Sequence, residues 1–258
     1  LSTVFQLAGC FLMSRTHTAS TGEILPSPEY DQSRMGNLLG GIFAPLLDRI
    51  IKPILEGMVY IYTNKAIAIF MILVVFHCSL VMSFESILPI FSRESLGAID
   101  GSYLGYLVMA FGVGSLIGNL LLAGVRNEKH KGQLFIWIGV LSGVNPAILA
   151  FSLDITSSLA ISALMGATQA TFMALTNTYV QIMAPDRLRA RISSLYILHA
   201  GGIMAFMNLG NGYLADKFGP SPIMSIAAAG FLVMMVFSIM LPGWKTLYKG
   251  SISSTNNL

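Results

Sequence analysis

Long apolar stretches alternate with short polar turns over most of the chain. Six of them are long enough for a helix to cross a bilayer and contain no Lys or Arg. They cover residues 66–91, 103–125, 133–151, 155–183, 192–215 and 220–242. The turns between them are so short that neighbouring helices must run antiparallel, and nothing alternates with the two-residue period of a membrane barrel. The pattern predicts an all-α membrane protein with six transmembrane helices.

The first quarter of the chain has a different pattern. Residues 1–13 are expected to be the remnant of a preceding transmembrane helix, and Leu1 suggests that the chain is a fragment of a longer protein. Residues 14–65 are predicted to be a cytoplasmic linker, which contains an interfacial amphipathic helix over 42–63, interrupted near Pro53. The six-helix domain then covers 66–242, and 243–258 form a cytoplasmic tail.

Composition supports a membrane protein, since 54% of the residues are hydrophobic and 10% are charged, with a mean hydropathy of +0.71. If residue 66 enters from the cytoplasm, thirteen of the 15 Lys and Arg residues lie inside. Only Arg93 and Lys217 lie in outer turns. The positive-inside rule therefore predicts a multi-pass protein of the plasma (inner) membrane with a cytoplasmic C-terminus.

A basic cluster, "APDRLRARIS" at 184–193, raises the question of ligand binding. Its charged residues are Asp186, Arg187, Arg189 and Arg191. A nucleic-acid site would need a broad basic face with interleaved aromatic residues, whereas this is one short loop between two spans. We therefore interpret the cluster as a cytoplasmic topology determinant, with a plain Asp–Arg surface pair as the simplest contact, and expect no nucleic-acid partner.

Glu85 is the one acid well inside a span. A carboxylate in hydrocarbon must face protein or water, so Glu85 could couple protons to transport, or it could lie near the outer interface. His77, eight residues earlier, either shares a cavity with Glu85 or bonds to a neighbouring helix.

Other polar side chains recur on the fourth and fifth spans. They are Gln169, Thr176 and Asn177 on the fourth, and Asn208 and Asn211 on the fifth. Such residues either line a wet cavity, where they would contact a small-molecule substrate or a coupling ion, or bridge helices. The sequence leaves both interpretations open.

Glycines mark close helix packing. The stretch "FGVGSLIG" at 111–118 resembles a dinucleotide fingerprint, but Ile117 replaces the third glycine and no strand precedes it. Gly114 and Gly118, four residues apart, instead predict close approach of another helix, and Gly201 and Gly202 suggest the same for the fifth span. These glycine-lined faces indicate that the domain packs against a partner.

No enzyme is predicted, because no nucleophile–base–acid set, metal-ligand spacing or phosphate loop occurs. Cys10 and Cys78 both lie in apolar runs and are expected to be small buried hydrophobes. We expect no metal and no cofactor; the lipid bilayer is the first partner.

A short sequence motif occurs twice, once in each half of the six-helix domain. "GNLLLAG" at 118–124 closes the second span and "GNGYLAD" at 210–216 closes the fifth, which runs in the opposite direction. Three spans followed by three inverted spans form a 3+3 inverted repeat, as in many secondary transporters.

The chain from about residue 54 to 242 resembles the C-terminal six-helix half of a major facilitator superfamily transporter, in the enterobactin-exporter and macrolide-efflux branch. The resemblance lies in "ILEGMVYIYTNKAI", "GYLVMAFGVGSLIGNLLLAG", "APDRLRARISSL" and "GNGYLADKFGP". Pro185, Arg189, Arg191 and Ser194 match the family's P-x-x-x-R-G-R-x-x-S-like stretch in the loop between helices ten and eleven, with Ala190 where glycine is common. The resemblance implies that Arg189 and Arg191 hold the cytoplasmic gate through acids or helix C-termini.

The resemblance also implies a function for the whole protein. We expect a secondary active transporter that exports a small molecule by alternating access, with protons as the candidate coupling ion. Its partner would be the missing N-terminal six-helix half. The alternative is a non-transporting polytopic membrane protein, such as a scaffold or a subunit of a complex.

Overall fold

The computed structural model describes residues 52, 54–98, 101–125 and 127–240, without the side chains of 128 and 129. The helix remnant predicted at 1–13, most of the linker and the tail at 243–258 lie outside the described residues. Residues 1–43 form a separate unit of the chain, so the fold described below belongs to the unit that begins at Ala44.

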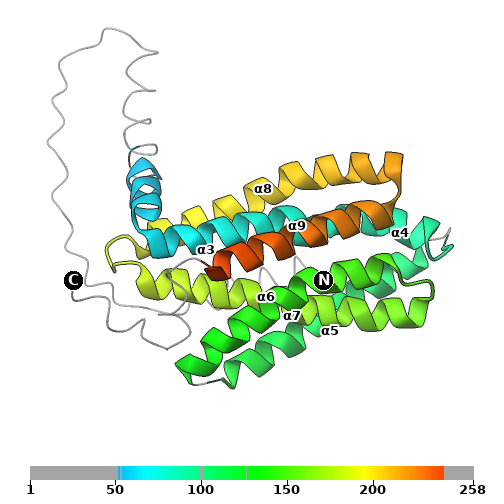
Figure 1. Cartoon of the computed structure of the whole chain (residues 1–258), viewed down its shortest axis with the longest axis horizontal. Coiled ribbons are helices and arrows are strands. Elements are labelled where there is room, and N and C mark those ends of the chain that lie inside the picture. The colour runs from blue at the N-terminus through cyan, green and yellow to red at the C-terminus, as the bar shows by residue number, and fades with distance from the viewer. Residues whose placement is uncertain (1–51, 53, 99–100, 126, 241–258) are drawn as a thin grey trace, which may run out of the picture. The chain divides into compact units, whose positions relative to one another are not determined.

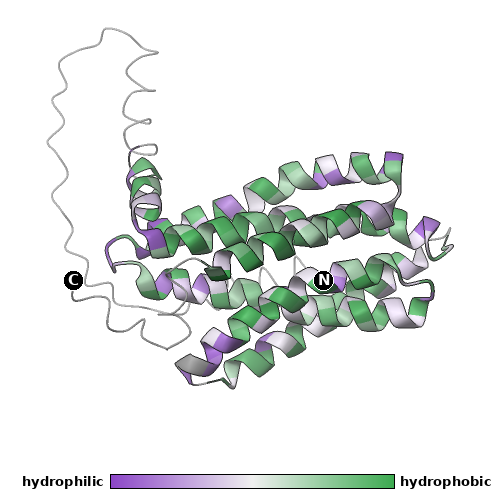
Figure 2. Cartoon of the chain, viewed as in Figure 1, coloured by the Kyte–Doolittle hydropathy of each residue, from purple (hydrophilic) through white to green (hydrophobic). Residues whose placement is uncertain are grey.

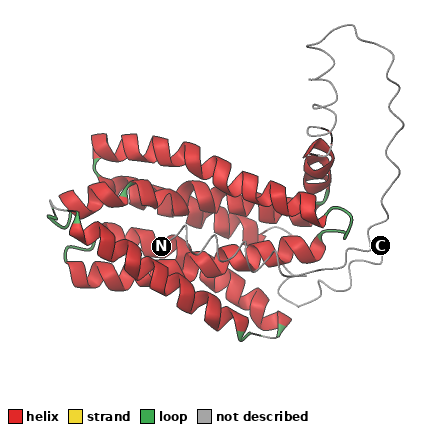
Figure 3. Cartoon of the chain, turned by 180° about the vertical axis from the view of Figure 1, so that it is seen from behind, coloured by secondary structure: helices red, strands yellow, loops and turns green. Residues whose placement is uncertain are grey.

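Every regular element in the described part of the chain is helical (Figures 1 and 3). The labelled helices are α3 (Lys65–Phe76), the π-helix η1 (His77–Val81), the 3₁₀-helix η2 (Met82–Ser86), α4 (Leu88–Glu94), α5 (Ser102–Ala123), α6 (Glu128–Ala150), α7 (Ile155–Met183), α8 (Arg189–Phe218) and α9 (Pro220–Met240), and an unlabelled helix covers 54–63. Six apolar segments are long enough to cross a membrane: Lys65–Ser86, Ser102–Ala123, His130–Ala150, Ile155–Met183, Arg189–Phe218 and Pro220–Met240. The predicted all-α fold with six spans is confirmed.

Local sequence signals explain where several helices begin. The side chain of Asn64 caps α3 and accepts from the backbone N–H groups of Ala66 and Ile67 at 3.2 and 3.3 Å. Asp154 caps α7 and accepts from the Ser157 N–H at 2.7 Å. Pro220 opens α9 directly after Gly219, whose φ of +84° is a conformation that favours glycine.

The first span is not a uniform α-helix. It changes to a π-helix at His77 and to a 3₁₀-helix at Met82, which the apolar pattern alone does not predict. Serine hydroxyls bond to carbonyls along this stretch: Ser79 donates to Phe76 O at 3.2 Å, and Ser86 donates to Ser83 O at 2.9 Å. Such bonds matter in a span, because hydrocarbon offers an irregular backbone no water.

Contacts between the helices follow an inverted order. The second span, α5, packs on α7, and the fifth, α8, packs on the first span along α3, η1 and η2. The third span, α6, packs on the fourth span, α7. In the same way the sixth span, α9, packs on the first, and α6 and α9 also pack on each other. Exchanging the two triplets of spans therefore preserves these contacts, as a 3+3 inverted repeat requires.

The repeated sequence motif does not carry this symmetry. Gly118 of the first copy is buried against α7, whereas Gly210 of the second is exposed with no atom within 4 Å of an added Cβ. Asn119 is exposed and Asn211 is buried. The corresponding residues of the two motif copies therefore lie in different environments. The symmetry lies in which helices contact each other and not in these residues.

The most hydrophilic residues lie mainly toward the two ends of the helices, with mostly hydrophobic residues between them (Figure 2). Because the spans alternate in direction, the starts of α3, α6 and α8 share one end. We call this the basic end, since it carries Lys65, Lys131, Arg187, Arg189 and Arg191. Its location on the cytoplasmic side stays a prediction of the positive-inside rule.

Candidate functional site

His77 lies near the middle of the first span, where the helix changes from α to π. It is twelve residues, or about 18 Å along the helix, from Lys65, in a bilayer core about 30 Å thick. The side chain is fully buried, and Nε2 lies 2.6 Å from Ser142 Oγ of α6. Its ring packs on Phe172 and Phe231, with centroids 4.5 and 5.1 Å apart. Of the two predicted roles, the structure shows the hydrogen bond to a neighbouring helix.

Gln169 lies on α7 about one turn from Phe172, the residue that packs on His77. It is fully buried, and neither its Nε2 nor its Oε1 has a hydrogen-bond partner among the described residues. The Nδ1 atom of His77 is likewise without one. Buried polar groups are rarely left unpaired, so these atoms mark where water or another polar group would be stabilised.

Two further residues extend this polar layer, and the sequence interpretation missed both. Asn145 of α6 donates to Thr168 Oγ1 of α7 at 3.0 Å, and both are buried. Asn145 stands beside Pro146 within the last third of an apolar span, and an amide inside such a span was the available signal. Thr176, by contrast, donates to Phe172 O of its own helix at 2.6 Å, so its hydroxyl bridges no helices.

Asn211 joins the fifth span to the first, since its Nδ2 donates to Ser83 Oγ at 2.6 Å. Asn208, about one turn away on α8, has a buried Oδ1 without a partner among the described residues. Asn177 accepts from Gln181 on its own helix at 3.0 Å. Of the five polar residues predicted on these two spans, Asn211 alone is seen to bridge helices.

Glu85 lies apart from His77. It is exposed on η2 and forms no ion pair within the described ranges. Twenty residues separate it from Lys65, which puts it about 30 Å along the span, near the end opposite the basic end. His77 is enclosed by Ser142 and two aromatic rings, so a cavity shared with Glu85 stays a prediction.

The arginine cluster at the basic end is held by specific partners. Arg189 forms an ion pair with Asp186 at 2.7 Å and donates from Nε to Gln181 O, near the end of α7, at 3.2 Å. Arg191 pairs with Glu56 at 2.8 Å. Arg187 is exposed and has no ion pair with another described residue. The contact of Arg189 with Asp186 is the predicted surface pair.

The helix at 54–63 packs against the start of α8 at this end. Besides the pairing of Glu56 and Arg191, Tyr62 OH lies 3.1 Å from His199 Nε2. His199 Nδ1 donates to Leu195 O at 2.7 Å, so Nε2 of the neutral ring accepts from Tyr62. A Cβ at Gly57 would lie 2.7 Å from Leu195 Cδ1, which shows how closely the helices approach.

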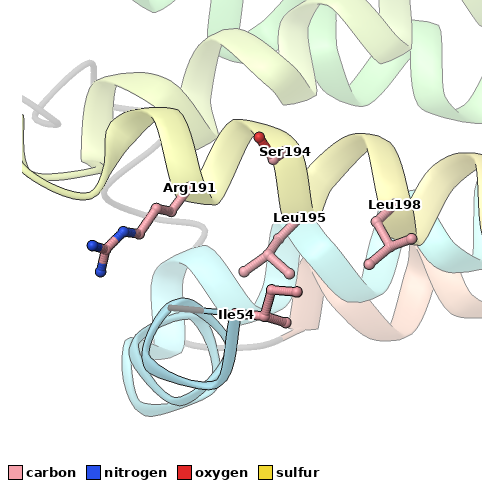
Figure 4. A pocket seen from close by; sticks show the side chains of 5 residues that line it. All are labelled: Ile54, Arg191, Ser194, Leu195 and Leu198. Carbon is pink, nitrogen blue, oxygen red and sulfur yellow. The ribbon is translucent and has the colours of Figure 1, made fainter. Parts of the chain in front are cut away.

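Two grooves flank this helix. The first, of about 390 Å³, is lined by Ile54, Arg191, Ser194, Leu195 and Leu198 (Figure 4). The second, of about 490 Å³, is lined by Lys52, Leu55, Glu56, Val59, Tyr60, Thr63, Arg187 and Leu188. We call them the apolar groove and the basic groove. The sequence predicted an interfacial helix but not these contacts, because they join residues more than 130 positions apart.

The glycines divide into two groups. A Cβ at Gly114 would lie 1.8 Å from Ala163 O, and one at Gly118 would lie 2.5 Å from Ala167 O, so both pack on the backbone of α7. At Gly201 and Gly202 an added Cβ meets no atom within 4 Å. The packing role predicted for these two is therefore not realised within the described chain, because no helix lies over their face of α8.

Six antiparallel apolar helices with inverted contacts and a buried polar layer define an integral, multi-pass membrane protein of the inverted-repeat class. Residues 44–256 match the family described as transmembrane secretion effector. The chain therefore belongs to this family of major facilitator superfamily transporters.

One curated relative is the multidrug efflux pump Tap of Mycolicibacterium fortuitum, 22% identical over 204 residues. The match covers 78% of this chain and 49% of the relative, so the chain spans about half the length of the pump. No solved structure matches the chain.

Proposed function

We propose that this chain is the C-terminal half of a secondary active exporter, which moves a small amphipathic molecule out of the cell by alternating access. Its family and its similarity to a multidrug efflux pump support export. Its length, about half that of the pump, supports a second six-helix half as the partner. The protein would reside in the plasma membrane with its basic end in the cytoplasm.

The uncovered faces of α5 and α8 carry this proposal. Only 17% of the apolar window of each helix is buried, against 33% to 61% for the other four spans. An added Cβ at Gly105 or Gly112 of α5, or at Gly201 of α8, meets no atom within 4 Å. Small residues in membrane helices favour contact with another helix over contact with lipid. The two helices would therefore face the partner half.

Transport is tested by dye efflux from bacteria that lack their major multidrug exporters. Cells expressing the complete gene should extrude ethidium faster than vector controls, and cells expressing residues 1–258 alone should not. Gly201→Leu should block extrusion because leucine would hold the two halves apart, whereas the matched Gly201→Ala should retain most of it. A normal membrane level of protein without extrusion of ethidium, rhodamine 6G or Hoechst 33342 would contradict export and favour a non-transporting membrane protein.

Proton coupling is assigned to Glu85, because it is the exposed and unpaired carboxylate of the first span. Glu85→Gln should remove the dependence of efflux on the proton gradient, whereas Glu85→Asp should preserve it. Initial efflux rates are measured at several external pH values, with and without a protonophore. An unchanged pH profile in Glu85→Gln would exclude this coupling role while leaving export itself intact.

The buried polar layer would line the transport path. Gln169 and Asn208 each retain an unpaired side-chain atom in the described chain, and Thr176 and Asn177 follow on α7 toward the basic end. In alternating access such groups are exposed in turn, as the halves rock about a site near the midplane. Substrate contact with these residues rests on the proposed export and is tested with it.

A further inference from the structure

The helix at 54–63 stands at the basic end of the bundle, transverse to the spans and beside the start of α8 (Figure 1). It is followed at once by Asn64 and by α3, which begins at Lys65, so it lies at the level where a span leaves the hydrocarbon. Two of its apolar side chains, Leu55 and Val59, are 53% and 62% exposed. A helix in this position, with uncovered apolar side chains, contacts lipid at the membrane surface.

The basic groove beside this helix carries positive charge that no acid among the described residues neutralises. Glu56, which lines it, is already paired with Arg191 at 2.8 Å. Lys52 and Arg187 also line it, and neither has an acidic partner in the described part of the chain. Within the described residues, these two cations face the groove without a counter-ion, close to the exposed Val59.

The apolar groove on the other side of the helix offers a comparison within the same molecule. Its one lining cation, Arg191, is neutralised by Glu56. Figure 4 shows the guanidinium group directed away from Ile54, Leu195 and Leu198. The two grooves thus have similar apolar walls but differ in free charge, so the basic groove alone should select an anion.

We propose that the basic groove binds one anionic phospholipid from the leaflet at the basic end. The lipid phosphate would lie between Lys52 and Arg187, and its acyl chains would follow Leu55 and Val59 toward the hydrocarbon. Basic pockets at the ends of membrane helices bind anionic head groups because the charges attract where little water screens them. The bound lipid would link the helix at 54–63 to the loop that precedes α8.

Native mass spectrometry of the 258-residue chain in neutral detergent tests this proposal. The chain is titrated with dioleoylphosphatidylglycerol and, separately, with dioleoylphosphatidylcholine. The double variant Lys52→Gln/Arg187→Gln should bind phosphatidylglycerol about 25-fold more weakly, about fivefold for each cation lost. Binding of phosphatidylcholine should stay unchanged.

The matched control is Arg93→Gln/Lys217→Gln, which also removes two positive charges, but at the opposite end of the bundle. It should bind phosphatidylglycerol as the unmodified chain does, and an equal loss in both variants would overturn the proposal by showing a general charge effect. Val59→Ser should also weaken phosphatidylglycerol binding, since the acyl contact is lost. If inorganic phosphate displaced the lipid at equal concentration, or if the basic groove were filled by a second copy detected as a dimer, the lipid assignment would fail.

Folding of the variants is checked by their helical circular dichroism and monodispersity. If the double variant does not fold, Arg187→Gln alone carries the test, because Arg187 is exposed and unpaired with other described residues. It should weaken phosphatidylglycerol binding about fivefold. Unchanged binding in a folded Arg187→Gln variant would refute the site.

Discussion

Gly114→Ala should separate the second span from the fourth. The added Cβ would lie 1.8 Å from Ala163 O, and ordinary van der Waals contact begins at 3.4 Å, so the backbones must move apart by about 1.6 Å. Gly166 lies in the same interface from the side of α7, since its own added Cβ would lie 1.9 Å from Phe111 O. The obstacle on each side is a main-chain carbonyl, which cannot rotate away as a side chain would.

The size of the effect follows from a matched control on the same helix. Gly112 also lies on α5, but an added Cβ there meets no atom within 4 Å. Both substitutions gain the helix propensity of alanine, about 1 kcal/mol, so this gain cancels in the comparison. Overpacking typically costs about 1–3 kcal/mol, and the rigid main-chain neighbour puts Gly114→Ala near the upper end, at about 3 kcal/mol. Gly114→Ala should therefore melt roughly 6–12 °C below Gly112→Ala, at about 2–4 °C for each kcal/mol.

Melting is measured through the reactivity of the Cys78 thiol. Cys78 is 1% exposed, so it becomes reactive only when the bundle opens. The chain carries Cys10→Ala so that a maleimide dye reports Cys78 alone during heating in detergent. Gly166→Ala should behave as Gly114→Ala does, because it contacts the same interface from the other side. Equal melting temperatures for Gly114→Ala and Gly112→Ala would refute the close approach of α5 and α7.

Three further predictions concern hydrogen bonds and ion pairs. Ser142→Ala should destabilise the chain by about 1–3 kcal/mol in the same thiol assay, because it leaves a buried His77 nitrogen unpaired. Adding His77→Leu should recover part of this loss. If Ser142→Ala alone causes no loss of stability, the hydrogen bond is contradicted. The pKa of Asp154 lies below its usual value because a backbone N–H and a hydroxyl donate to the ionised carboxylate. Its cap therefore stabilises fully above about pH 4 and is lost as pH falls through the lowered pKa. Asp154→Asn should flatten the acid limb of melting temperature against pH, and an unchanged limb would exclude the cap as its source. Glu56→Gln should leave the melting temperature within a few degrees of that of the unmodified chain, since an exposed ion pair contributes about 0–1 kcal/mol. It should nevertheless speed amide hydrogen exchange over residues 54–63. Unchanged exchange would mean that Arg191 does not hold this helix.

Much of the fold follows from the sequence, because membrane spans depend on hydropathy and length, which are local properties. The six spans begin and end within a few residues of their predicted limits, and the spacing of Gly114 and Gly118 predicts close packing on another helix. The change of helix type at His77 could not be predicted, since an apolar run reads alike for α and π geometry. At this point His77 contacts Ser142 of α6 and Phe231 of α9, which are distant in the sequence.

The candidate site was less predictable, because its contacts join distant parts of the chain. Glu56 is one of several charged residues in an amphipathic stretch, and nothing in its neighbourhood identifies Arg191 as its partner. Asn211 and Gln169 look alike as amides inside spans, yet one bridges to Ser83 and the other has no partner in the described structure. Hydropathy shows that a polar residue is buried but not which neighbour it meets.

The serine-supported stretch of the first span bears on how this protein tolerates changes in chain length. In a regular helix of 3.6 residues per turn, a one-residue insertion turns every later side chain by about 100° and would move polar groups into lipid. A π turn accommodates one surplus residue within a single turn. At 77–81 that turn is already present, and the hydroxyls of Ser79, Ser83 and Ser86 bond to nearby carbonyls. Insertions and deletions within the spans of related chains should therefore concentrate at this stretch, where length can vary without loss of the buried face.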